Sequence, residues 1–245
     1  MSMPRHFSHQ TIKRNAATSP NQRGNIIFMV LLAIALIGLL TVAIQRTDSG
    51  DASNISGETL MIRASEVQRT ASEIERAVMY IMERGNVSER DLRFAIPTDN
   101  STEYGDITSQ PRRQIFHADG GAANYPTPPT GVQNAVAPWE FYGGTRIPGV
   151  GTNRTDLIAV LPNVTLQFCE LINRLNGQTD SQPAEDGAGC INQGATQRFG
   201  TEFFNDATPN TLNDASFTRT PALQACVRCP ADGGTYHFYH VLYAR

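Results

Sequence analysis

Residues 25–44 read NIIFMVLLAIALIGLLTVAI, a run of twenty residues without a charged side chain. Only Asn25 and Thr41 are polar, so a helix formed by this run is apolar on every side. At 1.5 Å per residue, its length is about 30 Å, close to the thickness of the hydrocarbon core of a bilayer. The run therefore predicts a transmembrane helix over residues 25–45, with a buried core helix as the alternative.

The charges on either side of this run predict its orientation. Residues 1–24 contain four basic residues and no acidic residue, whereas the rest of the chain contains 16 basic and 23 acidic residues. Lys and Arg in short flanking segments stay on the cytoplasmic side of a membrane. We therefore expect residues 1–24 to be a cytoplasmic leader or tail and the acidic remainder to be exported. A cleaved secretory signal is disfavoured, because its apolar core is shorter and a small-residue cleavage site would follow it.

A second helix is predicted from Ser56 to Arg84, after a polar hinge at residues 47–54. Its apolar residues recur at alternating steps of four and three, which is a heptad seam over about three heptads. The seam either packs along its own globular domain, which is the preferred interpretation, or pairs with a copy of itself. Hinge and helix together make up residues 46–85. The seam residues are Leu60, Ala64, Val67, Ala71, Ile74, Val78 and Ile81.

Residues 86–245 are expected to form a globular domain of the α+β class, in which the heptad helix packs on a small antiparallel sheet. Strands are predicted at residues 139–142, 156–161 and 235–244, where aromatic and β-branched residues gather. An amphipathic helix through Val164, Phe168 and Ile172 is predicted to end at Gly177. The Gly- and Pro-rich residues 99–150 predict irregular packed structure, a capping box at Ser88–Asp91 predicts a short helix, and residues 178–190 and 205–221 are predicted loops.

Four cysteines, Cys169, Cys190, Cys226 and Cys229, all fall in the last third of the chain. An even number in an exported domain predicts two disulfides within loops, with three possible pairings. Cys169 with Cys190, and Cys226 with Cys229, is one plausible pairing; four free thiols are the alternative. The C-x-x-C spacing also fits a redox pair, but that function requires a helix directly after the motif, where Pro230 stands. Zinc would need two further ligands, and Cys169, Cys190, His237 and His240 occur at spacings that match no zinc motif.

No arrangement of residues in the sequence indicates catalysis, a metal site or a cofactor. His237 and His240 would lie on opposite faces of a strand, because three residues is an odd step. The Gly-rich stretches lack the Gly-Lys-Ser/Thr of a phosphate loop. The net acidic charge and the lack of clustered basic residues outside the tail argue against nucleic acid as a partner. Several aromatic side chains could form a binding face, although core packing is their more frequent use: Tyr125, Trp139, Tyr142, Tyr236, Tyr239 and Tyr243.

The order of segments resembles type IV pilins and the pseudopilins of type II secretion. The resemblance rests on Arg23-Gly24, the apolar run that follows and the long amphipathic helix, and it covers residues 23 to about 84. It implies that a prepilin peptidase cuts between Gly24 and Asn25 and methylates the new amine. It also implies that the apolar helix anchors the subunit in the bacterial inner membrane and then packs in a filament core. The residues expected in this membrane and assembly helix are Ile26, Phe28, Met29, Leu32, Leu36 and Leu40.

The first residues after the expected cut depart from the family pattern. Asn25 stands where the family has Phe or Met, and Met29 stands where it has Glu. Absence of that Glu resembles the tip pseudopilins, or a pilin-like anchor that does not polymerise. The whole chain, including residues 139–141, 149–152 and 241–245, is also similar to a group of bacterial pilin-like membrane proteins, a likeness that supplies no activity.

The resemblance therefore implies a structural subunit of a pilus, a filament tip or a secretion apparatus. Its partners would be the membrane, other pilin-like subunits or secretion components, and prepilin peptidase; the outer domain would be periplasmic or extracellular. One alternative is a non-polymerising membrane-anchored binding module. Another is an envelope thiol oxidoreductase that uses Cys226 and Cys229.

Overall fold

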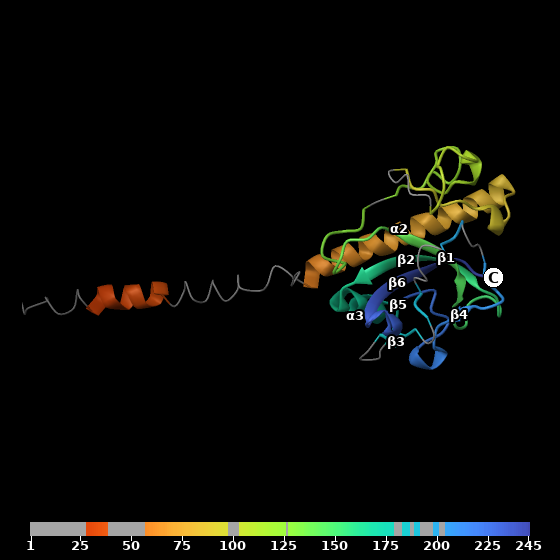
Figure 1. Ribbon diagram of the computed structural model, residues 1–245. Helices are drawn as coiled ribbons and strands as arrows, with labels where there is room; N and C mark the ends of the chain where they lie inside the picture. Colours follow the sequence, from red (N-terminus) through yellow and green to blue (C-terminus); the bar gives the residue numbers. More distant parts are fainter. Residues whose placement is uncertain are drawn as a thin grey trace, which may run out of the picture. The chain divides into compact units, whose positions relative to one another are not determined.

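The chain forms two compact units, Met1–Asn54 and Ile55–Arg245. The computed structural model describes residues 28–38, 57–97, 103–125, 127–178, 183–186, 189–191, 198–200 and 204–245. In the first unit these residues form a single helix over residues 28–38. All further elements belong to the second unit (Figure 1).

A twisted sheet lies at the centre of the second unit, with strand order β3-β5-β6-β2-β1-β4. Its four longer strands are antiparallel neighbours, and the two short strands β3 and β4 extend the edges in parallel. The predicted antiparallel sheet is therefore confirmed, with two parallel edge strands added. The strands are β1 Glu140–Arg146, β2 Asp156–Val164, β3 Ala184–Glu185, β4 Asn210–Thr211, β5 Gln224–Cys229 and β6 Thr235–Tyr243.

Two helices, α2 (Gly57–Gly85) and α3 (Leu166–Leu175), cover one face of the sheet (Figure 1). The long α2 packs across β6, and α3 packs on β5 and on α2. Short 3-10 turns connect the remaining segments: η1 Glu89–Asp91, η2 Pro111–Arg113, η4 Asp214–Ser216 and η5 Pro230–Asp232.

Alternation along the central strands divides the core into two clusters, one on each face of the sheet. Phe238 and Leu242 of β6 face the helices, whereas Tyr239 and Val241 face the opposite side. That opposite side is covered by irregular segments, which contribute Ile147, Val150, Ile191, Leu212 and Phe217. Because both faces are covered, β2 and β6 are almost wholly buried. Such strands read as continuous apolar runs in sequence, which is why both were predictable.

The predicted elements compare closely with the observed ones in four places. The heptad helix, the strand at 156–161, the strand at 235–244 and the short helix after Ser88 are all present, the last as a 3-10 turn whose N-cap is Ser88. The predicted strand at 139–142 occurs as β1, which starts one residue later and runs to Arg146.

Three predictions of secondary structure were wrong in part. Val164 belongs to β2, not to the helix, because Pro162 and Asn163 continue the strand through an irregularity between Leu161 and Val164. The helix begins only after Thr165, whose hydroxyl accepts a hydrogen bond from the Phe168 N–H. The predicted loops at 178–190 and 205–221 contain the edge strands β3 and β4, and β5 was not predicted.

The Gly- and Pro-rich segment packs on α2 as irregular structure held by side chains. The Gln114 amide accepts the Ala95 N–H and donates to the carbonyls of Asp106 and Ser109. At Gly121 a Cβ atom would lie 2.9 Å from the Ala77 Cβ of α2 and 2.6 Å from the Ile115 carbonyl oxygen. Only glycine permits this approach of the loop backbone to the helix.

Candidate functional site

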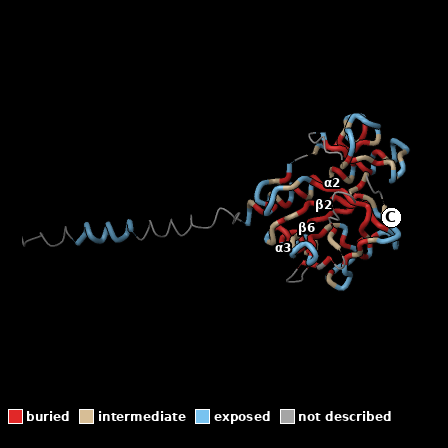
Figure 2. Tube along the Cα trace, in the orientation of Figure 1, coloured by how far each residue is buried: buried red, intermediate tan, exposed pale blue. Residues whose placement is uncertain are grey.

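The helix of residues 28–38 is apolar on all sides and exposed along its whole length (Figure 2). It carries Phe28, Met29, Leu32 and Leu36 of the expected assembly helix, and Phe28 is 64% exposed. Soluble domains rarely expose a contiguous apolar surface of this kind, which marks contact with lipid or with another apolar surface.

The rest of the predicted transmembrane run cannot be compared with the structure. Gly24, Asn25, Ile26 and Leu40 lie outside the described residues. The described helix has eleven residues, about 16 Å of helix. Among the described residues, none of the helices is both long enough and apolar enough to cross a membrane.

The heptad seam of α2 faces its own domain. Its seven residues are all buried, and Ala64, Ala71, Ile74 and Val78 have no exposed surface. Thr70 and Ala77 are also buried, so the buried side of the helix is wider than the heptad seam. Ala77 lies against the loop at Gly121. The preferred interpretation, packing along the domain, is therefore confirmed; the seam is not available to a second copy while this packing holds.

The outward side of α2 is polar in the middle and apolar at both ends. Ser65, Arg69 and Arg76 occupy the middle. Met61 and Ile62 are exposed near the start of the helix, and Met79 and Tyr80 near its end. The inner side of the helix thus packs on the domain, whereas its outer side contacts loops through single side chains such as Arg63 and Glu73.

Both disulfides predicted from the even cysteine count are present, but the plausible pairing suggested by the spacing was wrong. The bonds join Cys169 to Cys226 and Cys190 to Cys229. Cys226 and Cys229 lie in β5 three residues apart, so their side chains point to opposite faces of the sheet. Cys226 therefore meets α3 on the helical face, and Cys229 meets the segment containing Cys190 on the other face. A bond within the C-x-x-C motif is geometrically excluded in this strand.

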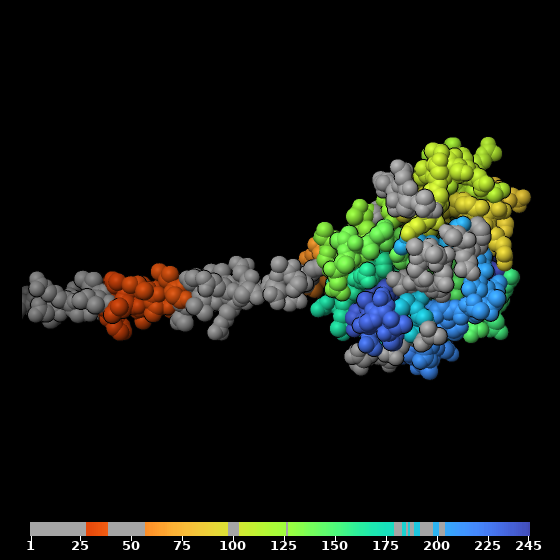
Figure 3. Space-filling model, in the orientation of Figure 1, coloured from red at the N-terminus to blue at the C-terminus, as the bar shows by residue number. Residues whose placement is uncertain are grey.

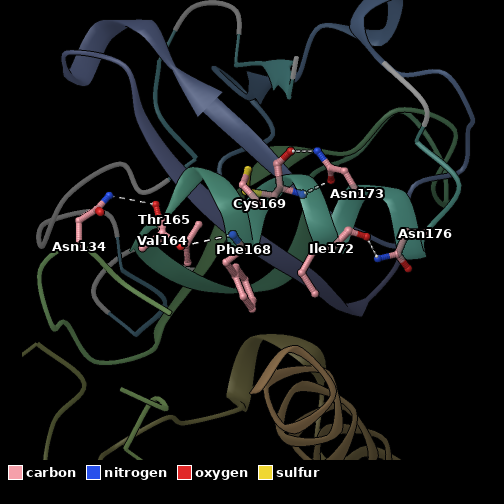
Figure 4. The surroundings of a disulfide bond; sticks show 9 residues. Asn134, Val164, Thr165, Phe168, Cys169, Ile172, Asn173 and Asn176 are labelled. Atoms are coloured by element: carbon pink, nitrogen blue, oxygen red, sulfur yellow. Dashed lines mark hydrogen bonds between the residues drawn. A yellow bond between two sulfur atoms is a disulfide. The ribbon is translucent and has the colours of Figure 1, made fainter. Parts of the chain in front are cut away.

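Asn173 reinforces the attachment of α3 to β5 beside the first disulfide (Figure 4). Its amide oxygen accepts the Cys226 N–H at 2.7 Å, and its amide nitrogen donates to the Cys226 carbonyl at 2.9 Å. The Asn173 side chain is buried. It therefore supplies the Cys226 backbone with the two hydrogen bonds that a neighbouring strand would otherwise make. A disulfide and two hydrogen bonds thus hold one helix to one strand residue.

The two histidines of β6 are both buried and lie on opposite faces, as the odd step predicted. His240 lies under α2, with its Nε2 2.7 Å from a Glu75 carboxylate oxygen. On the other face, the His237 Nε2 lies 2.9 Å from the Thr235 hydroxyl. Burial lowers the pKa of His237 to about 4, against a smaller opposing effect of Asp232. His237 is therefore a neutral imidazole at physiological pH, and the two rings cannot share one metal ion.

A charged cluster that the sequence did not reveal lies at the start of β1. The Arg198 guanidinium pairs with Glu103 and with Glu140, at 2.5 Å for the latter. The Tyr142 hydroxyl donates to the other Glu140 oxygen at 3.0 Å. Burial raises the pKa of Glu140 to about 7. These partners lie 37 and 58 residues from Glu140 along the chain, so no local pattern could have identified them.

The Gly-rich turn at residues 149–152 and the last residue, Arg245, meet in the structure. The Thr152 N–H donates to the Arg245 carbonyl, and a Cβ at Gly151 would overlap that carbonyl. The buried Arg245 guanidinium lies 3.8 Å from the centre of the Phe204 ring and pairs with Asp206 at 3.4 Å. The turn therefore packs against the backbone of Arg245 and does not form a phosphate site.

The remaining candidates do not assemble into a binding face or a metal centre within the described residues. Of the aromatic set, Trp139, Tyr142 and Tyr239 are buried in the core, which agrees with packing. No group of three His, Cys, Asp or Glu side chains suited to a metal occurs in the described part of the chain. A polar cavity of about 210 Å³ is lined by charges of both signs, including Arg93, Glu103 and Asp106.

The chain was compared with protein-family models, with curated proteins and with solved structures, and none of them matches it. The functional argument therefore rests on the residues of this chain.

Proposed function

We propose that this chain is a pilin-like or pseudopilin-like structural subunit of the bacterial cell envelope. In this proposal, the run Asn25–Ile44 anchors it in the inner membrane, with residues 1–24 cytoplasmic and the second unit outside. The observation that carries the proposal is the helix of residues 28–38, which is wholly apolar, wholly exposed and belongs to a unit of its own. Such a helix requires lipid or apolar partners along its full circumference.

The architecture of the second unit supports the same proposal. A long helix near the start of the proposed exported part lies along an antiparallel sheet. Two disulfides join α3 and the segment containing Cys190 to β5. This is the order expected of a pilin-like subunit, and disulfides suit an oxidising compartment. The basic residues 1–24 and the net acidic remainder give the expected orientation. Prepilin peptidase and other pilin-like or secretion components are the proposed partners.

A non-polymerising anchored binding module is the second candidate, and one residue favours it. Met29 occupies the place of the family's Glu, and it is exposed in the apolar helix. A methionine cannot neutralise the N-terminal amine of a neighbouring subunit. The two candidates share the membrane anchor and differ in self-assembly, which crosslinking between subunits in intact membranes would detect.

Thiol exchange is not proposed. Each cysteine of the C-x-x-C motif is bonded to a cysteine outside the motif, and both are fully buried. A thiol oxidoreductase needs an accessible pair that forms and breaks its own bond.

Alkaline extraction of membranes tests the anchor. We expect the full-length chain to stay in the membrane pellet, and the double variant Leu32→Arg/Leu36→Arg to be released, because charges in the middle of the helix oppose insertion. Leu223→Arg is the matched control: Leu223 is an exposed apolar side chain of the second unit, and its variant should remain in the pellet. Release of the unaltered chain would refute the anchor.

A further inference from the structure

The outer side of α2 combines exposed apolar residues with charges of alternating sign. Ile62 near the start of the helix is 69% exposed, and Tyr80 near its end is 55% exposed. Between them the sign of the charge alternates along this side of the helix. We call this side the α2 outer surface; it consists of Ile62, Ser65, Glu66, Arg69, Glu73, Arg76 and Tyr80. It is distinct from the heptad seam, which is buried in the domain.

The loop before β1 contacts the α2 outer surface along one edge. The Glu73 carboxylate accepts an N–H of this loop at 3.0 Å, and the neighbouring Arg63 guanidinium donates to the Thr130 carbonyl. Figure 3 shows the green atoms of the loop beside the first orange residues of α2. Glu66 and Arg69 are exposed, and their side chains form no hydrogen bond or ion pair with any residue that the structure describes. Their charges are therefore open to a partner.

The order of the charges is self-complementary in an antiparallel pair of helices. When a second copy of α2 runs in the opposite direction and the two helices meet at the level of Ala71, Glu66 of each copy lies level with Arg76 of the other. Arg69 of each copy then lies level with Glu73 of the other. In a parallel pair in register, each charge would instead face the same charge on the second copy, which is unfavourable. Charge complementarity therefore favours a second copy of α2 as the partner, in the antiparallel arrangement.

The ends of the surface match in the same arrangement. Ile62 lies level with Tyr80 of the second copy, so an aliphatic and an aromatic side chain meet at each end. Beyond them, Glu58 lies level with Arg84. Opposite charges three and four residues apart also stabilise a single helix, but that effect leaves Ile62 and Tyr80 exposed. These two residues are eighteen positions apart, about 27 Å along one helix, so they meet only between copies.

We infer that the α2 outer surface is a dimer interface, in which α2 packs antiparallel against α2 of a second copy about a two-fold axis level with Ala71. Such an interface is isologous and closed, since each copy contributes the same residues. The inference goes beyond the proposed function and uses only residues of the second unit, so it holds or fails independently of the membrane anchor. Because the charges lie at the solvent-exposed rim, we expect salt to weaken the association by screening them.

Crosslinking of introduced cysteines tests the inference in the full-length protein, purified in mild detergent at low ionic strength. The four native cysteines are all bonded in disulfides, so they do not react. Oxidation of an equimolar mixture of Ile62→Cys and Tyr80→Cys should give a covalent dimer on a non-reducing gel, because the two positions are level in the antiparallel pair. Either variant alone should give several-fold less dimer, since each position then lies about 27 Å along the helix from its own copy.

Charge reversal supplies a matched set of variants. Glu66→Arg in both partners of the mixture places like charges opposite Arg76 at two sites of each dimer, and we expect it to weaken association by about tenfold at low salt. Adding Arg76→Glu restores opposite charges and should restore the crosslinked fraction. This rescue arises only between copies, because the two residues lie about 15 Å apart along one helix. Glu170→Arg, the same charge change at an exposed position of α3, is the control and should leave crosslinking unchanged.

Three results would overturn the inference. The first is the absence of a crosslink in the mixture although circular dichroism shows folded protein. The second is efficient crosslinking of each single variant with itself, which indicates a parallel pair. The third is association that light scattering detects but that Glu66→Arg does not weaken, which means that the apolar run or another surface holds the copies together. None of these results bears on the anchor, which alkaline extraction of membranes tests separately.

Discussion

Asn173 shows how much a single buried side chain contributes in this fold. Replacing it with alanine leaves the N–H and the carbonyl of Cys226 unpaired inside the protein. We expect Asn173→Ala to lower the free energy of unfolding by about 1–3 kcal/mol, measured by denaturant titration of the oxidised protein in mild detergent. Gln167→Ala is the control, because Gln167 is exposed on the same helix. An equal effect of the two substitutions would contradict the assigned role of Asn173.

Burial of His237 makes the free energy of unfolding depend on pH, because burial lowers the pKa of this side chain. Its pKa is about 4 in the folded protein and near 6.5 in the unfolded chain. The unfolded chain therefore binds more protons between these values, and the His237 contribution to stability is complete above pH 6.5 and is lost as the pH falls toward 4. The loss is on the order of 3 kcal/mol.

The contribution of His237 has to be measured as a difference, because buried acids titrate in the same range with the opposite sign. Burial raises the pKa of Glu140 to about 7 and that of Asp186 to about 6. Denaturant titrations at pH 7 and pH 4.5 should therefore compare the unaltered protein with His237→Gln. We expect the unaltered protein to lose more stability on acidification than the variant does. Parallel losses would show that His237 is not buried as a neutral ring.

At the scale of single elements, α2 is stabilised by the side that faces its domain. Ile74 is fully buried on this side, whereas Ile62 is exposed on the other. We expect Ile74→Ala to cost about 2–5 kcal/mol of unfolding free energy, and Ile62→Ala to change it by about 0.5 kcal/mol or less. The fluorescence of the buried Trp139 reports unfolding. If Ile74→Ala were silent and instead reduced self-association, the seam would be an interface between copies.

Elements with a strong periodic pattern were predictable, and those defined by distant contacts were not. The steps of four and three in α2 and the apolar runs of β2 and β6 identify their own structure. By contrast, β5 was not predicted, and a bond between Cys226 and Cys229 was considered plausible from their spacing in the sequence. Had β5 been recognised as a strand, the odd-step argument that separated His237 from His240 would also have separated Cys226 from Cys229.

The buried polar groups could not be predicted from the sequence either, because their partners are distant along the chain. The Glu140–Arg198–Glu103 cluster joins three segments that no local signal connects. The turn at Gly151 contacts Arg245, which lies almost a hundred residues later in the chain. The Gly-rich sequence predicts a turn at this place, but only the three-dimensional structure shows that the turn contacts Arg245.

At the scale of the whole molecule, the disulfides join segments that are 57 and 39 residues apart. Loops of this length give each bond about 4 kcal/mol in the chain-entropy treatment. Proteolysis of the unreduced protein, followed by mass spectrometry, should release linked peptides containing Cys169 with Cys226 and Cys190 with Cys229. A peptide in which Cys226 is bonded to Cys229 would contradict the placement of these residues in β5.

The membrane anchor and its processing decide between the proposed functions, and one measurement addresses both. Intact mass and N-terminal sequence should be determined on the protein extracted from its native membranes. The account predicts a chain that begins at Asn25 with a methylated amine, which is the product of a prepilin peptidase. A membrane-extracted chain that still carries residues 1–24 would contradict a processed pilin-like subunit and leave an anchored outer domain in its place.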